Sequence, residues 1–391
     1  MKNKNKKKIC VAINNRANYA RVKSLLIEIK KNKKFELQIL LGASAILSRF
    51  GELDRILKKD GFKKFEKIYS IVEGENLTTM AKSTGLSIIE TSTFFENYRP
   101  DAVIVIADRF ENLSVAIAAS YLNIPLIHIQ GGEVTGSIDE KVRHSITKLS
   151  DIHFVATKRS RDFLIKMGEN KKSVFLTGCP SIDIAHKAKS KLPKDFFIKN
   201  KGVGNFPNYN EKYIVVMHHP VTTKFNETYT QIMQTINAII KVKDVKIVWL
   251  WPNIDAGSDI ISKQLRIIRE NKLVRNISFF KNFTPENYIK LIFNCECLVG
   301  NSSSGIRESS FLSIPVVNIG SRQKNREQGF NVLNVDYNKN EIFNAISKQM
   351  NKRKIRKSFI YGDGYAYKKI VNILIKIFKK EISVEKELNY L

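Results

Sequence analysis

The chain has 391 residues, of which 43% are hydrophobic and 10% aromatic, so it can bury two cores of ordinary domain size. This composition excludes disorder as its main state. No apolar run approaches the roughly 18 residues that a membrane-spanning helix needs, which excludes an integral membrane protein. The apolar stretch behind the basic N-terminus, residues 9–13, is too short for a signal-peptide core, and we expect a cytoplasmic protein with no membrane partner.

Lysine and arginine number 66 against 37 aspartate and glutamate, a formal net charge of +29. This excess allows a nucleic-acid-binding protein, but the lysines are spread along the chain and no zinc finger or RNP-type aromatic motif accompanies them. We therefore expect lysines on solvated faces, no nucleic-acid partner, and an attraction for anionic small molecules. Cys295 and Cys297 have no second pair at metal-ligand spacing, so we predict no metal site and no cofactor.

In the first half of the chain, short apolar runs alternate with amphipathic segments of helical period, which is typical of repeated βα units. The predicted strands are 8–13, 35–41, 102–107, 126–129, 152–155 and 174–176. The predicted helices are 19–31, 77–98, 110–122, 139–149 and 158–167. Residues 185–209 are lysine-rich and then rich in glycine, asparagine and proline, and we interpret them as a linker.

The pattern restarts behind this stretch and predicts a second parallel sheet. The predicted strands are 213–217, 246–250, 277–280, 297–299 and 316–319, and the predicted helices are 228–241, 258–271, 285–293 and 305–312. Residues 340–380 are predicted to be helical and are strongly basic. We predict an α/β fold with two doubly wound, Rossmann-like domains at 1–195 and 210–360, and a C-terminal helix within 361–391 that packs back on the first domain.

Polar clusters follow several predicted strands, and ligands of open α/β sheets bind beyond the carboxyl ends of the strands. In the first half these clusters are Asn14–Tyr19, Asp108–Glu111 and the dense run from His128 through His144. An N-cap, a structural ion pair, and a capped helix with an Asp139–Arg143 pair are the structural alternatives. They leave Glu133, on a glycine loop, unexplained. Paired carboxylates in a cleft are typical of proton transfer.

The clusters in the second half are His218–Thr223, Trp251–Ser258, Gly300–Glu308 and Gly320–Glu327. Small residues between a strand and a helix let backbone N–H groups and hydroxyls approach a diphosphate, and a basic loop beside them strengthens this interpretation. A structural histidine pair, an ordinary turn, a serine-rich turn and a solvated charged turn are the alternatives. The Gly300–Glu308 run is not a P-loop, which requires Gly-Lys-Ser/Thr.

In this order and spacing, the clusters and the run Tyr361-Gly362-Asp363-Gly364 resemble the hydrolysing UDP-N-acetylglucosamine 2-epimerases over roughly residues 8–375. The similarity is to the bacterial enzymes of sialic acid synthesis and to the epimerase half of the animal bifunctional enzyme. The resemblance implies a GT-B-like fold, an active site in the cleft, UDP held mainly by the C-terminal domain, and a homodimer or homotetramer. It also implies that UDP-N-acetylglucosamine is converted to N-acetylmannosamine and UDP by C2 deprotonation, elimination of UDP to a glycal, and hydration.

The resemblance implies that Asp108, Glu133, Asp139 and His219 are catalytic. It makes the three carboxylates the acid–base groups, without settling which is base and which is acid, and it places His219 near the diphosphate. The substrate-binding residues that it implies are Arg16, Arg109, Arg143, His144, Asn253, Asp255, Ser258, Ser302, Ser303, Ser304, Gly305, Glu308 and Arg322.

Asn18 stands where the family commonly has an acidic residue, and this leaves other substrates open: UDP-2,4-diacetamido-trideoxyglucose or GDP-N-acetylglucosamine, in legionaminic acid routes. The runs 143–148 and 219–223 look like the hydrolysing rather than the non-hydrolysing branch. A retaining GT-B glycosyltransferase is the alternative of another class, because it shares the fold and the glutamate that binds the nucleotide.

Overall fold

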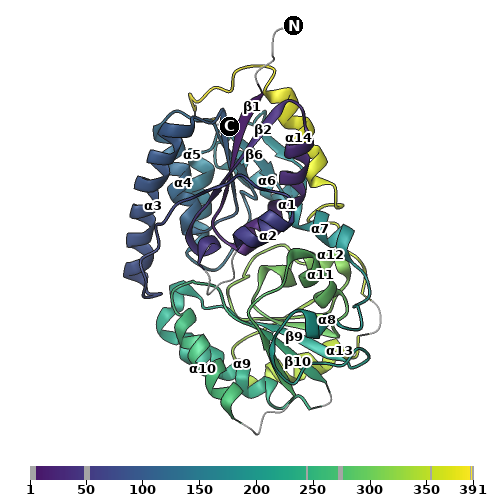
Figure 1. Ribbon diagram of the computed structural model, residues 1–391. Helices are drawn as coiled ribbons and strands as arrows, with labels where there is room; N and C mark the ends of the chain where they lie inside the picture. The colour runs from purple at the N-terminus through teal and green to yellow at the C-terminus, as the bar shows by residue number, and fades with distance from the viewer. Residues whose placement is uncertain are drawn as a thin grey trace.

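The computed structural model describes residues 6–47, 53–243, 245–271, 276–352, 355–387 and 389, and it contains two seven-stranded sheets, each covered by helices (Figure 1). The first sheet has the order β3-β2-β1-β4-β5-β6-β7, and all its pairings are parallel. Its strands are β1 (Lys7–Ile13), β2 (Phe35–Leu41), β3 (Glu66–Lys67), β4 (Ala102–Ile106), β5 (Leu126–Ile129), β6 (Ile152–Val155) and β7 (Val174–Leu176). Its helices are α1 (Arg16–Lys31), η1 (Ala43–Ile46), α2 (Leu53–Lys59), α3 (Leu77–Tyr98), α4 (Phe110–Tyr121), α5 (Asp139–Leu149) and α6 (Lys158–Lys166).

The second sheet has the order β14-β13-β12-β9-β10-β11-β8 and is parallel except for the edge strand β8. Its strands are β8 (Val203–Gly204), β9 (Tyr213–Met217), β10 (Lys246–Leu250), β11 (Ile277–Phe280), β12 (Cys297–Gly300), β13 (Val316–Ile319) and β14 (Val332–Val335). The remaining helices are α7 (Pro180–Ala188), α8 (Phe196–Lys199), η3 (Thr222–Glu227), α9 (Thr228–Ile239), α10 (Ser258–Glu270), α11 (Pro285–Phe293), η4 (Ser303–Gly305), α12 (Glu308–Leu312), α13 (Lys339–Met350) and α14 (Ala366–Ile377). The predicted doubly wound α/β fold is confirmed.

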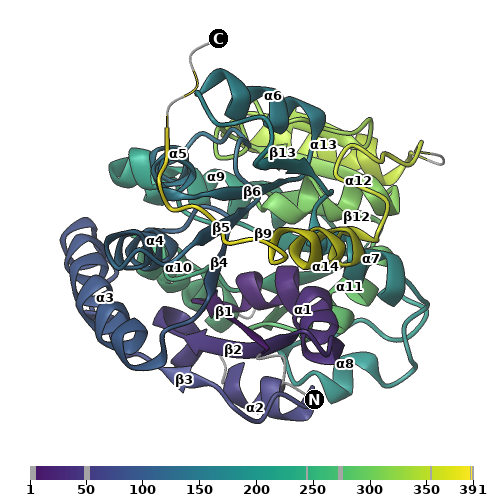
Figure 2. The same ribbon diagram turned by 90° about the horizontal axis from the view of Figure 1, so that it is seen from above.

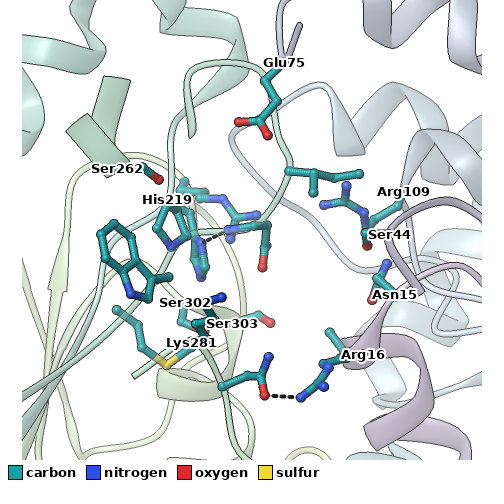
Figure 3. Close-up of a pocket in the computed structure, with 18 of the residues that line it drawn as sticks. Asn15, Arg16, Ser44, Glu75, Arg109, His219, Ser262, Lys281, Ser302 and Ser303 are labelled. Carbon is teal, nitrogen blue, oxygen red and sulfur yellow. Dashed lines mark hydrogen bonds between the residues drawn. The ribbon is translucent and has the colours of Figure 1, made fainter. Parts of the chain in front are cut away.

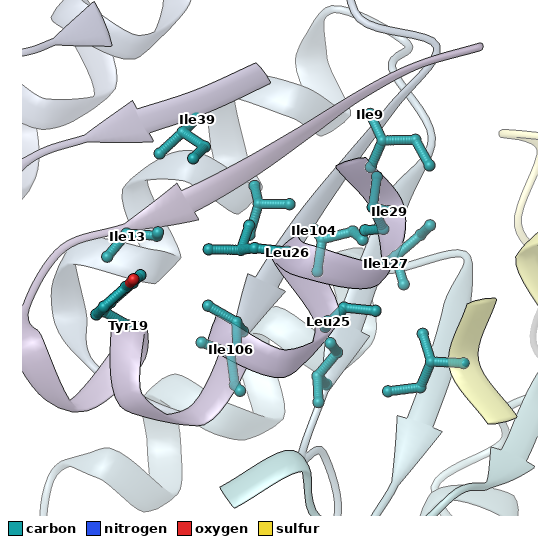
Figure 4. Close-up of a cluster of buried hydrophobic side chains, with 14 of the residues drawn as sticks. Ile9, Ile13, Tyr19, Leu25, Leu26, Ile29, Ile39, Ile104, Ile106 and Ile127 are labelled. Carbon is teal, nitrogen blue, oxygen red and sulfur yellow. The ribbon is translucent and has the colours of Figure 1, made fainter. Parts of the chain in front are cut away.

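A continuous apolar core fixes α1 against the first sheet (Figure 4). The Asn15 side chain accepts a hydrogen bond from the backbone N–H of Asn18 and so caps the start of this helix. Leu25 and Leu26 are fully buried against β1 and β4, and each such side chain contributes roughly 1.5–3 kcal/mol on burial. The loops that follow β1 and β4 therefore start from rigid elements.

The predicted linker, residues 185–209, is wrong in part, because it contains α8 and β8. Phe196 and Phe197 are buried there. Phe196 stacks on the ring of Phe283, and Phe197 packs at a tilt against the ring of Phe280, which ends β11 of the second sheet. The apolar pair lies inside a stretch whose overall composition is polar, and aromatic packing makes it part of the second core.

The basic C-terminal region is helical in two separate pieces, α13 and α14, and not throughout. Helix α14 lies beside α1 (Figure 2), and its buried residues Tyr367, Ile370 and Leu374 join the core of the first sheet. The division of the chain at residues 195, 210 and 360 stays a prediction. Within the described residues, no helix is both long and apolar enough to cross a membrane.

Strand order reverses at one place in each sheet, and these two places face each other. In the first sheet the reversal lies between β1 and β4, and in the second between β9 and β12. Loops diverge at such a switch point and leave a crevice where ligands of open α/β sheets bind. The polar clusters that begin at Asn14, Asp108, His218 and Asn301 follow these four strands, so the fold gathers them at one place.

Candidate active site

A cavity of about 920 Å³ lies between the two halves, at the carboxyl ends of both sheets (Figure 3). This volume falls in the range of small-molecule sites. Figure 3 shows Asn15, Arg16 and Arg109 on one side of the cavity and His219, Ser302 and Ser303 on the other. The predicted site residues that line it are Arg16, Asp108, Arg109, Asp139, His219, Asn253, Ser302, Ser303 and Arg322.

Two carboxylates, Asp108 after β4 and Asp139 at the start of α5, line the cavity and differ in their electrostatics. Burial alone would raise the pKa of Asp108, but Arg143 and Arg326 hold that pKa well below its usual range. Burial and the negative charge of Asp108 raise the pKa of Asp139 to about 6, although the guanidinium of Arg322 lies 3.9 Å from its carboxylate. In the absence of a ligand Asp108 is therefore ionised at neutral pH, whereas Asp139 titrates near neutrality.

Arg143 does not pair with Asp139, contrary to the structural alternative considered for this helix. Its guanidinium is fully buried, forms an ion pair with Asp108, and lies 2.8 Å from the carboxylate of Glu140. It also donates to the backbone carbonyl of Glu133. Arg143 does not line the cavity; it stands behind Asp108 and fixes that carboxylate toward the cavity.

Glu133 is 4% exposed and lies behind the cavity wall, not in it. Its carboxylate is 3.1 Å from Arg326 and 3.8 Å from Arg307, and both arginines come from the second half of the chain. Burial would raise its pKa, but these two guanidinium groups, Arg307 more strongly, bring that pKa below its usual value. Glu133 is thus an ionised carboxylate that ties the two halves together.

His219 follows β9, and its backbone forms two hydrogen bonds with the side chain of Asn301, from the loop after β12. The His219 N–H donates to Oδ1 of Asn301 and the His219 carbonyl accepts from its Nδ2, each at 2.8 Å. Its Nδ1 accepts a hydrogen bond from the backbone N–H of Asn253 at 3.4 Å. Burial, and secondarily the charge of Arg322, lower the pKa of His219 to about 3. The ring is therefore neutral at pH 7, and with Nδ1 accepting, Nε2 carries the proton.

The serine-rich loop after β12 divides into an exposed and a covered part. Ser302 and Ser303 line the cavity, and Arg21 of α1 donates to the hydroxyl of Ser303 at 3.2 Å. Ser304 forms a hydrogen bond with Tyr288, and Gly305 packs close to the side chains of Val316 and Leu298, so neither residue lines the cavity. Oε2 of Glu308 is buried and, within the described part of the chain, has no hydrogen-bond partner.

The other predicted site residues lie around the rim or behind it. Asp255 lies 2.5 Å from Arg109 and 3.6 Å from Arg322, so it links arginines of the two halves. Ser258 is buried at the start of α10. His144 lies outside the cavity and contacts the carboxylate of Glu140 at 2.9 Å.

Five arginines that line the cavity were not predicted as site residues: Arg21, Arg266, Arg269, Arg307 and Arg326. Arg307 and Arg326 stand within the polar runs that follow β12 and β13, so closer attention to their charge could have found them. Arg21 lies inside α1, so a search for polar residues directly after predicted strands does not find it. Within the described ranges, no group of three or more histidine, cysteine, aspartate or glutamate side chains could hold a metal ion.

Comparison with known proteins identifies relatives along nearly the whole chain. A sequence model of the UDP-N-acetylglucosamine 2-epimerase family matches residues 27–375. The UDP-N,N'-diacetylbacillosamine 2-epimerase (hydrolyzing) of Legionella pneumophila is 33% identical over 94% of this chain and 95% of its own. The GDP/UDP-N,N'-diacetylbacillosamine 2-epimerase (hydrolyzing) of Campylobacter jejuni is 30% identical over 85% of each chain.

Among solved structures, the UDP-GlcNAc 2-epimerase of Neisseria meningitidis bound to UDP-GlcNAc superposes with a TM-score of 0.76 at 19% identity. The superposition covers 94% of this chain and 100% of the Neisseria chain, and it shows the shared GT-B-like fold. The match to the family model and the identity to relatives named as hydrolysing lead to one conclusion: the chain belongs to the hydrolysing UDP-N-acetylglucosamine 2-epimerase family.

Proposed function

We propose that the chain is a cytoplasmic, homo-oligomeric enzyme that converts UDP-N-acetylglucosamine to N-acetylmannosamine and UDP for sialic acid synthesis. The observation that carries this proposal is Asp139. It is a carboxyl group with a pKa of about 6, facing a cavity whose other walls carry arginines and serine hydroxyls. A general base works best when its pKa lies near the working pH.

The reaction removes the proton on C2 while the bond between C1 and the UDP oxygen breaks, which gives a glycal and UDP. Water then adds its hydroxyl group to C1, and a proton returns to C2 on the opposite face. Because C2 is not next to a carbonyl group, the proton is weakly acidic and most of the driving force comes from stabilising the departing diphosphate. We assign the proton removal to Asp139, which is mostly ionised at pH 7.

The diphosphate is assigned to the groups that reach the cavity from the switch point of the second sheet. The hydroxyls of Ser302 and Ser303 and the neutral Nε2–H of His219 are donors there, and Arg21 and Arg322 add positive charge. Such donors, fixed before the reaction, stabilise charge that develops on a leaving group. The unpaired Oε2 of Glu308 is assigned to a ribose hydroxyl next to this loop.

The return of the proton is assigned to Asp108, the second carboxylate that lines the cavity. Arg143 and Arg326 keep it ionised in the free enzyme. A diphosphate bound nearby shares these positive charges and adds negative charge, and both effects raise the pKa of Asp108 so that it can carry a proton. Glu133, behind the wall, is a positioning group for Arg326.

The names of two relatives favour a second candidate substrate, a nucleotide-linked 2,4-diacetamido sugar. The relatives at 33% and 30% identity are named for UDP- or GDP-linked N,N'-diacetylbacillosamine, a 2,4-diacetamido-trideoxy sugar. The chemistry at C1 and C2 is the same for both sugars, so the residues assigned above serve either one. The two substrates differ only at C4 and C6, and the choice between them decides whether the product enters sialic or legionaminic acid synthesis.

The test is proton NMR of the purified protein in D₂O with UDP-N-acetylglucosamine, the 2,4-diacetamido UDP-sugar and GDP-N-acetylglucosamine in parallel. Release of the nucleotide together with a free 2-epimerised sugar that carries deuterium at C2 is the expected result, and the fastest substrate identifies the pathway. A stable UDP-N-acetylmannosamine product would place the enzyme in the non-hydrolysing branch. No turnover of any of the three sugars would refute the epimerase proposal and favour the glycosyltransferase.

A further inference from the structure

The loop before α5, residues 134–138, meets the second half of the chain at a point that leaves no room for a side chain. A Cβ atom placed on Gly136 would lie 2.0 Å from the backbone oxygen of Ser321. The backbone N–H of Gly136 donates to the carbonyl of Arg322 at 3.2 Å. The hydroxyl of Thr223 reaches the Gly136 carbonyl from a second element at 3.5 Å. The backbone of Gly136 thus packs directly against the backbone of the turn at 321–324.

This contact is coupled to the proton-transfer group by short connections. The backbone N–H of Thr135 donates to Glu140 at 2.7 Å, and the Thr135 hydroxyl accepts from Arg143 at 3.2 Å. The backbone N–H of Asp139 donates to the hydroxyl of Ser137 at 3.3 Å. The loop and the first turn of α5 therefore move as one piece. The contact between Gly136 and the turn at 321–324 therefore brings Asp139 close to Arg322, at 3.9 Å.

The other contacts across the cavity are polar and can open. They include the ion pairs Arg109–Asp255 and Arg326–Glu133 and the hydrogen bond from Arg307 to Gln130, 3.3 Å long. These ion pairs are largely buried, so they part only where water or a charged ligand takes the place of each partner. A substrate the size of a nucleotide sugar needs such an opening to enter and its product needs one to leave.

We propose that Gly136 is a positioning residue: the two halves close on its contact with Ser321 and Arg322, and this closure delivers Asp139 to the substrate. The inference rests on the proposed function in that it takes Asp139 as the base. The absence of a side chain at position 136 is what allows full closure. A methyl group there would hold the halves apart near the base, while the diphosphate-binding loop on the second half stays intact.

The test compares Gly136→Ala with Gly85→Ala, a matched control in the middle of α3 where an added Cβ meets no atom within 4 Å. We expect Gly136→Ala to lower kcat by at least about tenfold, since small misplacements of reacting groups have effects of that size, with a smaller loss of UDP affinity that reflects only the coupling of UDP binding to closure. Spin labels at Thr93→Cys and Lys263→Cys, on exposed sites of α3 and α10, should show a longer separation in Gly136→Ala with UDP bound.

An unchanged kcat, or a lowered kcat with an unchanged separation, would overturn the inference. Should Gly136→Ala fail to fold, hydrogen exchange of the unchanged protein still decides. The amide of Gly136 is expected to gain protection when UDP binds, and an exchange rate indifferent to UDP would contradict closure at this point. The spin-label and exchange measurements need no turnover, so they separate failure of this inference from failure of the proposed reaction.

Discussion

At the scale of single residues, the site uses three carboxyl groups in two electrostatic states. Asp108, Glu133 and Asp139 are all buried carboxyl groups, yet arginines keep the pKa of the first two low while Asp139, facing the charge of Asp108, has its pKa raised to about 6. Groups of one type whose environments separate their pKa values can divide acid and base roles. Burial and the position of the arginines, not the identity of the carboxylates, therefore determine which carboxyl group titrates near neutrality.

The predicted consequence is a pH dependence that belongs to Asp139. Because the base must be ionised, kcat/KM is expected to fall as pH drops through about 6 and to level off above it. Asp139→Asn should lower kcat/KM by about 10²–10⁴-fold and slow deuterium incorporation at C2 by the same factor. The measurement is a pH–rate profile, with Asp162→Asn, an exposed carboxyl-to-amide change on α6, as the control. Retention of the acid limb in Asp139→Asn would assign that limb to another group.

At the scale of elements, periodicity predicted most of the fold because buried strands and amphipathic helices carry strong local patterns. Strands β2 and β5 and helices α3 and α5 begin and end where the pattern placed them. The two-residue strands β3 and β8 were missed, since a pattern of period two needs more residues than they have. Their pairing depends on neighbours distant in the chain.

The sequence predicted those site residues that directly follow a long predicted strand, and it missed site residues whose position depends on how a helix packs. Residues directly behind long strands, such as Asp108 and His219, line the cavity as the rule of strand ends indicates. The rule could not tell that Arg143 would turn inward to Asp108 and away from Asp139, because both directions fit one helix. It also could not reach Arg21, whose place depends on how α1 packs.

Helix α5 is also held at its other end, by a residue far along the chain. Lys386 donates to the carbonyls of Thr147 and Ser150, at 3.0 and 2.6 Å, and its Nζ lies 2.7 Å from the carboxylate of Glu169. A cation near the last carbonyls of a helix is favourable. The C-terminal segment therefore stabilises the helix that carries Asp139.

Lys386→Met is expected to lower the free energy of unfolding by about 1.5–3 kcal/mol, the size of a hydrogen bond to a charged group, with Lys379→Met as the exposed control. Burial would raise the pKa of Glu169, but His153, Lys386 and Lys148 lower it to about 2. This contribution to stability is present above the unfolded pKa, near 4.3, and is lost as pH falls toward 2. Urea denaturation at pH 7 and pH 3 should show a smaller effect of Lys386→Met at pH 3; equal effects would exclude the coupling to Glu169.

At the scale of the whole molecule, the net charge of +29 has two parts with different behaviour. Lysines over the surface are exposed to salt. At about 0.1 M salt, screening removes most of their attraction for anions that are more than about 10 Å away. The side chains of Arg307 and Arg326 are only 2% exposed, and that of Arg322 is 12% exposed, so the salt of the solvent reaches them poorly. Screening weakens buried charges far less, and the cavity therefore keeps its attraction for anions when the surface loses it.

We expect the affinities for UDP and for a random oligonucleotide to depend differently on salt concentration. A salt titration followed by calorimetry measures both. Nonspecific nucleic-acid binding through six or more phosphate contacts falls about 10³–10⁵-fold between 50 and 200 mM salt, and we expect any oligonucleotide binding here to do so. UDP affinity should change far less and should persist in EDTA, because arginines supply the positive charge that a divalent cation would otherwise bring. Arg322→Gln should weaken UDP binding at all salt concentrations, whereas Lys379→Gln should leave it unchanged. Oligonucleotide binding that survives 200 mM salt, or UDP binding that requires Mg²⁺, would show that the charge of this chain serves a different ligand.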